Sequence, residues 1–288
     1  MTKSAPLSVD DTPRRQPQGG TLTLEVGYDH IFGGVFQDDA LKLSFRRSSK
    51  GEITSDELGV FLRGVLREWG FDPAAVERVA VCSVMPEHQQ AVESCSLTYF
   101  GKEPFFLRSG VKTGLKILTR NPVEVGPDRI AAAVGGVTLH PECHLIVADF
   151  DSVTTLDVIR GGRDYVGSVI LPGLRTAMES LVEHAGKMPP VEILVPQSVV
   201  GRSTQESIQA GLYFGHLYAL RSLMAEICQQ ELGGGAARIV RIATGSFAEL
   251  FEKADLFDAI YPDLVLTGLY RTALLNPVRS ARPVLVTV

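Results

Sequence analysis

The amino-acid sequence predicts an α/β protein built from two related halves. Strand-like and helix-like segments alternate along its 288 residues, as is typical of α/β folds. A strand, an acidic turn and a second strand occur near residue 25 and again near residue 149, and this repetition indicates a duplicated architecture. The length also favours two domains over one.

We expect four regions along the chain. The first and last have polar or irregular sequences, whereas the two middle regions have alternating strands and helices. The regions are a flexible tail over residues 1–20, an N-terminal domain over 21–137, a C-terminal domain over 138–275 and a second tail over 276–288.

Composition and charge exclude several classes of protein. Hydrophobic residues make up 45% and charged residues 21% of the chain, which is ordinary for a globular protein. The formal net charge is -5 and no stripe of Lys and Arg appears, so we expect no nucleic-acid partner. No apolar run is long enough to cross a bilayer, so no membrane association is expected, and the N-terminal tail lacks the apolar core of a secretory signal.

The cysteines favour a cytoplasmic location. They are Cys82, Cys95, Cys143 and Cys228. Their spacing matches neither a zinc site nor a disulfide framework. Free cysteines suit a reducing compartment, and we expect these side chains to be buried as small hydrophobic groups.

The first half is predicted to begin with an antiparallel three-stranded meander, because its β-prone runs are separated by short turns. A helix then begins at a capping signature, Thr54 to Glu57. The segment 109–126 is irregular, and long loops in compact domains are often functional. The predicted elements are strands at 21–25, 31–36 and 40–45, a helix at 54–69, a strand at 79–84, a helix at 87–100, a strand at 105–107 and a helix at 130–136.

The second half is predicted to repeat the meander and to add helices around it. A run of three glycines at 233–235 ends a long amphipathic helix. The predicted elements are strands at 145–148, 156–159 and 165–171, helices at 175–185 and 205–230, a strand at 238–243, a helix around 247–253 and a short helix after residue 266.

The turn that follows the strand at 145–148 is the first candidate site. Asp149 is followed by small or hydroxylated residues, a combination that suits a metal ion and phosphates. Taken alone, this sequence is better explained as a polar turn without a ligand. A second acidic turn, with Glu25 and Gly27, follows the first strand. Two such turns in a duplicated fold are expected to face each other across a cleft.

Two further segments place charged or small residues beside a helix start. Asp128 and Arg129 form either a cap and a salt bridge, or a proton acceptor beside an anion-binding guanidinium. The turn at Thr244, Gly245 and Ser246 lets a flat or phosphorylated ligand approach the backbone, although many such turns bind nothing. The residues alone leave both alternatives open.

The order of the motifs resembles type III pantothenate kinase over residues 21–270. The motifs that carry the resemblance are the acidic turn near residue 25, the segment 54–66, GVKTG at 110–114, NP at 121–122, EVGPDR at 124–129, the turn at 149–155, PGL at 172–174 and TG at 244–245. The resemblance implies an actin-like (ribonuclease H-like, duplicated) kinase fold with ATP between two domains. It also implies transfer of the γ-phosphoryl group of ATP to pantothenate, giving 4'-phosphopantothenate, the first step of coenzyme A biosynthesis.

The resemblance also implies roles for individual positions. Asp128 matches the catalytic base, which takes the hydroxyl proton of pantothenate while the guanidinium of Arg129 holds its carboxylate. The pantothenate-binding positions are Gly126, Pro127, Asp128, Arg129 and Thr204. The ATP-binding positions are Glu25, Gly27, Ser152, Thr244 and Gly245.

The resemblance implies cofactors and partners as well. Mg²⁺ is assigned to Glu25 and a monovalent cation, K⁺ or NH₄⁺, to Asp149, with ATP as co-substrate. The partners are pantothenate, ATP and a second copy of the chain in a homodimer. A heteromer with a paralogue is the alternative assembly.

Several positions depart from the family pattern. They are Glu25 for Asp, Tyr28 for Asn, Asp29 for Thr, Thr119 for Tyr, Asp151 for Gly, Ser152 for Thr and Ser246 for Gly. Asp151 brings a carboxylate towards phosphate, and two unit charges about 4 Å apart repel by about 4 kcal/mol at an effective dielectric near 20. The departures concern the nucleotide side more than the acceptor side.

Three hypotheses follow from this uneven pattern. The first is an ATP-dependent pantothenate kinase. The second is a catalytically degenerate pseudokinase paralogue that acts as a binding or structural subunit. The third is a kinase of the same fold with a changed acceptor. It is suggested by Thr119, which stands where the family has a Tyr that contacts pantothenate.

Overall fold

The computed structural model describes residues 19–186, 188–233 and 238–277. Its first half contains one sheet and the helices that cover it. The elements are β1 (Gly20–Val26), β2 (His30–Gln37), β3 (Ala40–Ser48), α1 (Ser55–Glu68), β4 (Val76–Ser83), α2 (Gln89–Cys95) and β5 (Phe105–Phe106). The first three strands are antiparallel, as predicted, and β4 runs parallel to β1. Thr54 and Glu57 form the predicted capping box at the start of α1.

The second half contains the larger sheet. Its elements are β6 (Lys116–Ile117), α3 (Pro127–Leu139), β7 (His144–Phe150), β8 (Val153–Arg160), β9 (Asp164–Pro172), α4 (Leu174–His184), α5 (Thr204–Ile227), β10 (Ile239–Thr244), β11 (Ala259–Ile260) and α6 (Leu264–Leu275). Strands β7, β8 and β9 form a second antiparallel meander, and β10 runs parallel to β7.

The two sheets repeat one topology. The first has the strand order β3-β2-β1-β4-β5, and the second has β11-β10-β7-β8-β9-β6. Read in the opposite direction, the second sheet repeats the meander and the two parallel strands of the first, with β6 added at its edge. This correspondence confirms the duplication that the two acidic turns predicted.

Local structure departs from prediction in several short segments. The irregular stretch 109–126 contains β6, which pairs in parallel with β9, and the two-residue strand β11 was not predicted. The predicted helix at 87–100 is α2 flanked by a 3₁₀ turn and a π turn, and the helix around 247–253 is a 3₁₀ helix. Very short strands depend on pairing with distant strands, so local sequence gives little sign of them.

Both predicted tails fall largely outside the described residues. Residues 1–18 and 278–288 are not described, whereas Gly20 already belongs to β1. At the other end, Asn276 accepts a hydrogen bond from Arg78 and donates to the carbonyl oxygen of Lys112 at 2.7 Å. The domain boundary at 137/138 stays a prediction. β6 precedes this boundary in the chain and nevertheless pairs with β9 of the second sheet.

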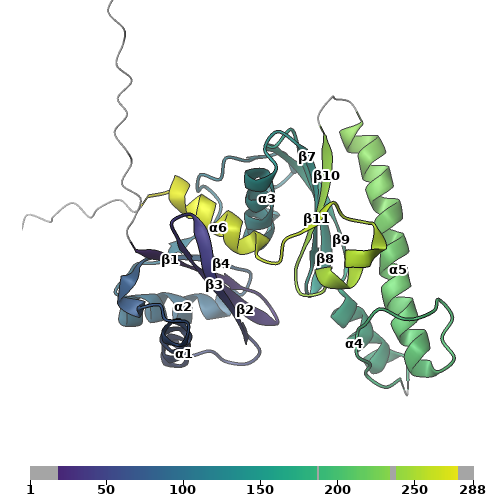
Figure 1. The fold of residues 1–288 in the computed structure, drawn as a ribbon, viewed down its shortest axis with the longest axis horizontal. Helices are drawn as coiled ribbons and strands as arrows, with labels where there is room; N and C mark the ends of the chain where they lie inside the picture. The colour runs from purple at the N-terminus through teal and green to yellow at the C-terminus, as the bar shows by residue number, and fades with distance from the viewer. Residues whose placement is uncertain (1–18, 187, 234–237, 278–288) are drawn as a thin grey trace, which may run out of the picture.

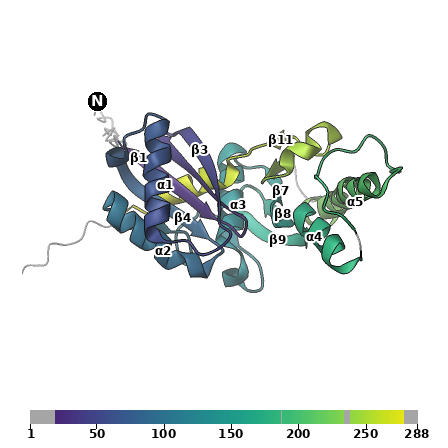
Figure 2. The same cartoon turned by 90° about the horizontal axis from the view of Figure 1, so that it is seen from below.

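Helices α3 and α6 lie between the two halves. Figures 1 and 2 show both helices in this position, with α1 and α2 on the outer side of the first sheet and α5 on the outer side of the second. α3 packs closely against α6, and α6 also contacts β1, β2 and β4. Gly135 of α3 and Gly268 of α6 allow this packing, because a Cβ at Gly268 would collide with the carbonyl oxygen of Ala131. The start of α3 is thereby held at the junction of the two halves.

Each sheet has an apolar core on its outer face. Leu58, Leu62 and Leu66 of α1 pack on β1 and β4, and α5 covers β7 and β8 in the same way. A third cluster joins α3 and α6 to the second sheet. Among the helices of the described ranges, none is long and apolar enough to span a membrane.

Candidate functional site

A cavity of about 130 Å³ lies where the turns after β1, β7 and β10 meet the start of α3. The parallel pairing of β7 with β10 places Asp149 beside Thr244. The predicted site residues that line the cavity are Glu25, Gly27, Asp128, Asp149, Ser152, Thr244 and Gly245. The structure therefore brings both acidic turns into one cleft.

Asp149 is buried at the end of β7 and has an oxygen without a partner. The residue is 6% exposed, and no group in the described ranges bonds its Oδ1 atom. Burial, followed by the charges of Asp151 and Glu25, raises the pKa of this carboxyl well above its ordinary value. A nearby cation would favour the ionised form of such a group.

Two glycines leave room for these carboxylates. Gly245 has a φ of +89°, in the left-handed region that favours glycine, and a Cβ there would collide with Asp149 Oδ1. A Cβ at Gly126 would collide with Asp128 Oδ1 in the same way. A larger residue at either position would displace a carboxylate of the cleft.

Asp128 lies in the first turn of α3 but does not cap the helix. The N-cap residue is Gly126, and Asp128 Oδ1 is buried without a hydrogen-bond partner in the described part of the chain. Burial raises the pKa of the Asp128 carboxyl, the Arg129 backbone N–H lowers it by a smaller amount, and the charge of Asp157 raises it further. The structure thus excludes a helix-capping role for Asp128.

Arg129 makes its salt bridge with Asp157 rather than with Asp128. Arg129 Nε and Nη2 donate to Asp157 Oδ1 at 3.0 and 2.6 Å, and Nη2 also donates to the Tyr165 hydroxyl at 2.7 Å. Asp157 and Tyr165 are fully buried. The sequence pattern did not predict Asp157. Its only signal is an acid inside the strand VTTLDVIR, which otherwise carries apolar and hydroxyl residues until its last position.

Asp29, which departs from the family pattern, is not an isolated anion. Ser152 Oγ donates to Asp29 Oδ2 at 3.3 Å, and Lys50 Nζ lies 3.1 Å from Asp29 Oδ1. Its neighbour Tyr28 is 63% exposed and lines the rim of the cleft. The additional carboxylate of the first turn, Asp29, is therefore paired with Ser152 and Lys50.

Asp151 is paired as well. Its Oδ1 atom accepts hydrogen bonds from the backbone N–H and the hydroxyl of Ser246 at 3.0 and 2.7 Å. Arg46 in turn donates to Ser246 Oγ at 3.2 Å. Two departures from the family pattern, Asp151 and Ser246, thus contact each other directly.

A second cavity, of about 470 Å³, is also lined by the start of α3. Its walls include Pro127, Ile130 and residues of the loop 108–113. Asp128 lines the first cavity and Pro127 the second, so the first turn of α3 lies between them. The volume of the second cavity is in the usual range of small-molecule sites.

Thr204 and Thr119 line neither of these cavities. Thr204 is exposed at the start of α5, and Figure 1 shows α5 on the side of the second sheet away from the first half. Thr119 Oγ1 is buried without a partner among the described residues. The structure therefore does not bring Thr204 to Asp128 within one chain.

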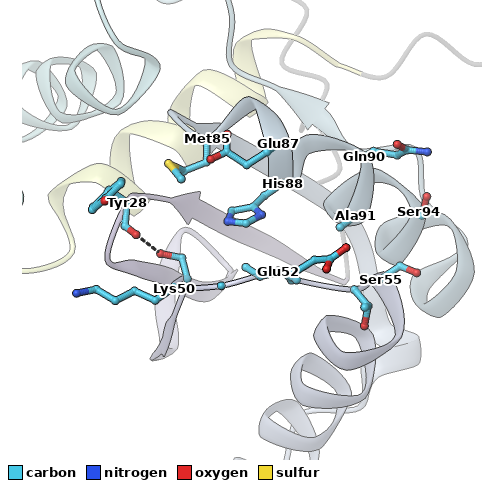
Figure 3. Close-up of a pocket in the computed structure, with 14 residues that line it drawn as sticks. Tyr28, Lys50, Glu52, Ser55, Met85, Glu87, His88, Gln90, Ala91 and Ser94 are labelled. Atoms are coloured by element: carbon cyan, nitrogen blue, oxygen red, sulfur yellow. Dashed lines mark hydrogen bonds between the residues drawn. The ribbon is translucent and has the colours of Figure 1, made fainter.

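A further hollow lies beside the cleft, on the first half. It measures about 860 Å³, and Figure 3 shows Lys50, Glu52, Glu87 and His88 around it. Tyr28 is shared with the cleft, but no predicted site residue lines this hollow. The predicted site residues gather instead around the cleft at the start of α3.

Sequence comparisons show which proteins this chain is similar to. The family described as type III pantothenate kinase matches residues 21–226. The chain is 47% identical over 255 residues to the type III pantothenate kinase of Legionella pneumophila (strain Corby), which covers 88% of this chain and 98% of the relative. It is 42% identical over 248 residues to that of Elusimicrobium minutum (strain Pei191), covering 86% of this chain and 95% of the relative.

A comparison with solved structures concerns the fold. MreB 5 of Spiroplasma citri bound to AMPPNP has a TM-score of 0.50 and 10% sequence identity, covering 88% of this chain and 95% of that chain. At this identity the likeness shows the fold alone. It confirms the predicted actin-like α/β fold.

Proposed function

This chain belongs to the type III pantothenate kinase family, and from that premise we propose how its two cavities divide the reaction. The enzyme transfers the γ-phosphoryl group of ATP to the primary hydroxyl of pantothenate, the first step of coenzyme A biosynthesis. ATP phosphates bind in the cleft, and pantothenate binds in the cavity lined by Pro127. Asp128 lines the cleft and its neighbour Pro127 lines the second cavity, and this adjacency is the observation that carries the proposal.

Asp128 is the catalytic base. Its unpartnered Oδ1 accepts the proton of the pantothenate hydroxyl as that oxygen attacks the γ-phosphorus. The pKa of this carboxyl is raised by burial, which makes it a stronger base than an ordinary Asp. Pro127 lines the cavity assigned to the acceptor, whereas Gly126 and Arg129 line neither cavity and are assigned to acceptor binding from the family motif alone.

The nucleotide side combines small, hydroxylated and basic residues. Gly27 and Gly245 give the phosphates access to the backbone, and the hydroxyl of Thr244 donates a hydrogen bond to them. The Ser152 hydroxyl, which donates to Asp29 in this structure, would turn to a phosphate when ATP binds. Arg46 lines the same cavity and supplies positive charge. Phosphoryl transfer depends on such positioning and charge neutralisation.

Two cations complete the proposed nucleotide site. Glu25 would hold Mg²⁺, and Asp149 would hold K⁺ or NH₄⁺, for which the unpartnered Asp149 Oδ1 is a suitable ligand. In the described ranges, no group of three His, Cys, Asp or Glu side chains is arranged so that it could hold a metal ion by itself. Mg²⁺ would therefore take its other ligands from phosphate and water, as it usually does. When bound, the cations neutralise the charge of the phosphates.

We expect a homodimer, because Thr204 does not line the cavity beside Asp128 within one chain. Apolar side chains at Ile170, Val199 and Val200 are exposed and would be covered by a second copy. That copy would also present its Thr204 to the acceptor. Sedimentation equilibrium should give twice the monomer mass, and a monomer at enzymatically active concentrations would contradict this assembly.

The described cysteines are all free, which fits the proposed cytoplasmic location.

The direct test of function is ADP formation with purified protein, pantothenate, Mg²⁺ and K⁺. Asp128→Asn keeps the size of the side chain but removes the base, and should lower kcat by about 10² to 10⁴. Asp258→Asn, the same change outside both cavities, should leave kcat unchanged. Absence of turnover, or an unaffected Asp128→Asn variant, would refute the proposal.

A further inference from the structure

Within the described part of the chain, two arginines line the cleft, and they differ in their contacts. Arg46 donates a hydrogen bond from Nη1 to Ser246 Oγ at 3.2 Å and lies over the ring of Phe32. Arg175 is partly buried, yet it makes no hydrogen bond or ion pair with any group in the described ranges. Five acidic residues of the described chain line the same cleft. A guanidinium whose donors stay free among these carboxylates is available to an incoming anion.

The start of α4 carries Arg175 to the second acidic turn. The Gly173 N–H donates to the carbonyl oxygen of Ser152 at 3.2 Å, and Thr176 Oγ1 donates to the same oxygen at 2.6 Å. A Cβ at Gly173 would collide with the carbonyl oxygens of Asp151 and Ser152, so glycine allows this close approach. Arg175 lies between these two anchors in the sequence, and the turn and the helix start therefore move as one unit.

The surroundings of Arg175 favour an anion. Its guanidinium carbon lies 5.5 Å from the centre of the Phe247 ring, and stacking on a ring holds a guanidinium without using its N–H donors. α4 has neither a side-chain cap nor an acidic residue in its first turn. The first backbone N–H groups of a helix carry partial positive charge, which no cap offsets here. Arg175 and the start of α4 therefore place positive charge on the same side of the cleft.

We propose that Arg175 is a further ATP-binding residue of this enzyme, whose guanidinium donates paired hydrogen bonds to the phosphate chain. Planar guanidinium groups match phosphate oxygens in this way. The inference rests on the proposed function, in which the ATP phosphates occupy the cleft. Arg175 and Asp151 line the same cavity, so the charge of Arg175 also opposes the repulsion between this carboxylate and phosphate.

The test measures Kd for Mg-ATP by calorimetry and the KM values for ATP and pantothenate. Arg175→Met keeps an unbranched apolar side chain but removes the charge and the donors. Kd and KM for ATP should rise about tenfold or more, since hydrogen bonds between charged groups contribute on this scale. KM for pantothenate should stay close to that of the wild type. Arg175→Lys keeps the charge but loses the planar pair of donors, so its Kd should fall between the two.

A second background separates phosphate binding from screening of Asp151. The carboxylate is absent in Asp151→Gly, and adding Arg175→Met to this variant should again raise Kd for Mg-ATP about tenfold. If Arg175 only screened Asp151, the substitution would have no effect in this background. That result would overturn the inference.

Arg67→Met is the matched control. Arg67 is exposed in the last turn of α1 and lines neither cavity, so Kd for Mg-ATP should stay within about twofold of the wild type. Wild-type Kd and KM for ATP in Arg175→Met, with pantothenate still turned over, would refute the role of Arg175 and leave the proposed function standing. If the wild type binds Mg-ATP without phosphorylating pantothenate, the proposed function fails, and the binding constants still decide the role of Arg175.

Discussion

Asp157, beneath the start of α3, and the two added acids of the cleft, Asp29 and Asp151, are held in different ways. Asp157 is fully buried and neutralises Arg129 inside a closed hydrogen-bond network. Asp29 and Asp151 lie on turns and bond short hydroxyl side chains. Solvent screens exposed charges far more than buried ones. Burial, more than the number of acids, therefore decides how strongly an internal carboxylate competes with an anionic substrate.

The nucleotide-side acids also link positions that look independent in the sequence. Ser152 bonds Asp29 across the two halves, and Ser246 bonds Asp151 while accepting a hydrogen bond from Arg46. The repulsion of about 4 kcal/mol expected for an isolated carboxylate near phosphate is therefore reduced. Four of the departures from the family pattern therefore form two hydrogen-bonded pairs, Ser152 with Asp29 and Ser246 with Asp151.

The largest expected effect breaks the network around Asp157. Asp157→Ala leaves Arg129 buried without its counter-ion, and removal of one partner of a buried pair usually costs about 3–5 kcal/mol of stability. Urea unfolding followed by circular dichroism should report a loss of this size.

The matched control removes both charges. Asp157→Ala combined with Arg129→Met contains no uncompensated charge, so it should be more stable than Asp157→Ala alone. A single variant as stable as the wild type would mean that the ion pair is not closed in solution.

A smaller effect is expected on the nucleotide side. Asp151→Gly removes a negative charge close to the ATP phosphates but also the hydrogen bonds to Ser246. Allowing for solvent screening, we expect a gain of about 1.4 kcal/mol, or a roughly tenfold lower KM for ATP.

Asp29→Thr should act in the same direction, since it removes the other added carboxylate. Weaker ATP binding in both variants would show that these acids recruit Mg²⁺ rather than oppose phosphate. An isothermal titration with and without Mg²⁺ separates the two cases.

The smallest effect concerns the pH dependence of catalysis. Asp128 must be ionised to act as a base, and its pKa is raised, chiefly by burial and further by the charge of Asp157. Activity should therefore fall as the pH drops through this raised pKa, above the ordinary range of Asp carboxyls. In Asp157→Asn the nearby negative charge is gone, so the acidic limb of the kcat/KM profile should move to lower pH. A limb at the same pH in both proteins would argue against this coupling.

Much of the fold was predictable because its signals are local. The capping box at Thr54, the apolar run that became β7, and the repeated strand and acid at Glu25 and Asp149 each lie within a few neighbouring residues. By contrast, β6 and β11 owe their existence to partners far away in the chain. A segment of two residues is too short to show the alternation of apolar and polar residues from which a strand is predicted.

The candidate site divides in the same way. Asp128, Asp149 and Gly245 were identified from motifs and their order, and they line one cleft. Asp157 was missed because an acid within a strand gives no sign of its partner. Arg129 lies 28 positions before it, and only the packing of α3 on the second sheet brings the two together.

The sequence by itself determined the α/β class, the duplication and the family. Periodicity and turn residues are properties of short segments, and the order of the motifs can be read directly from the chain. Only the tertiary structure decided which charges neutralise one another. Asp29 meets Ser152, Asp151 meets Ser246, and Arg129 is already bound to Asp157. The strength of each pair depends on distance and burial, and both are fixed only when residues remote in sequence pack together.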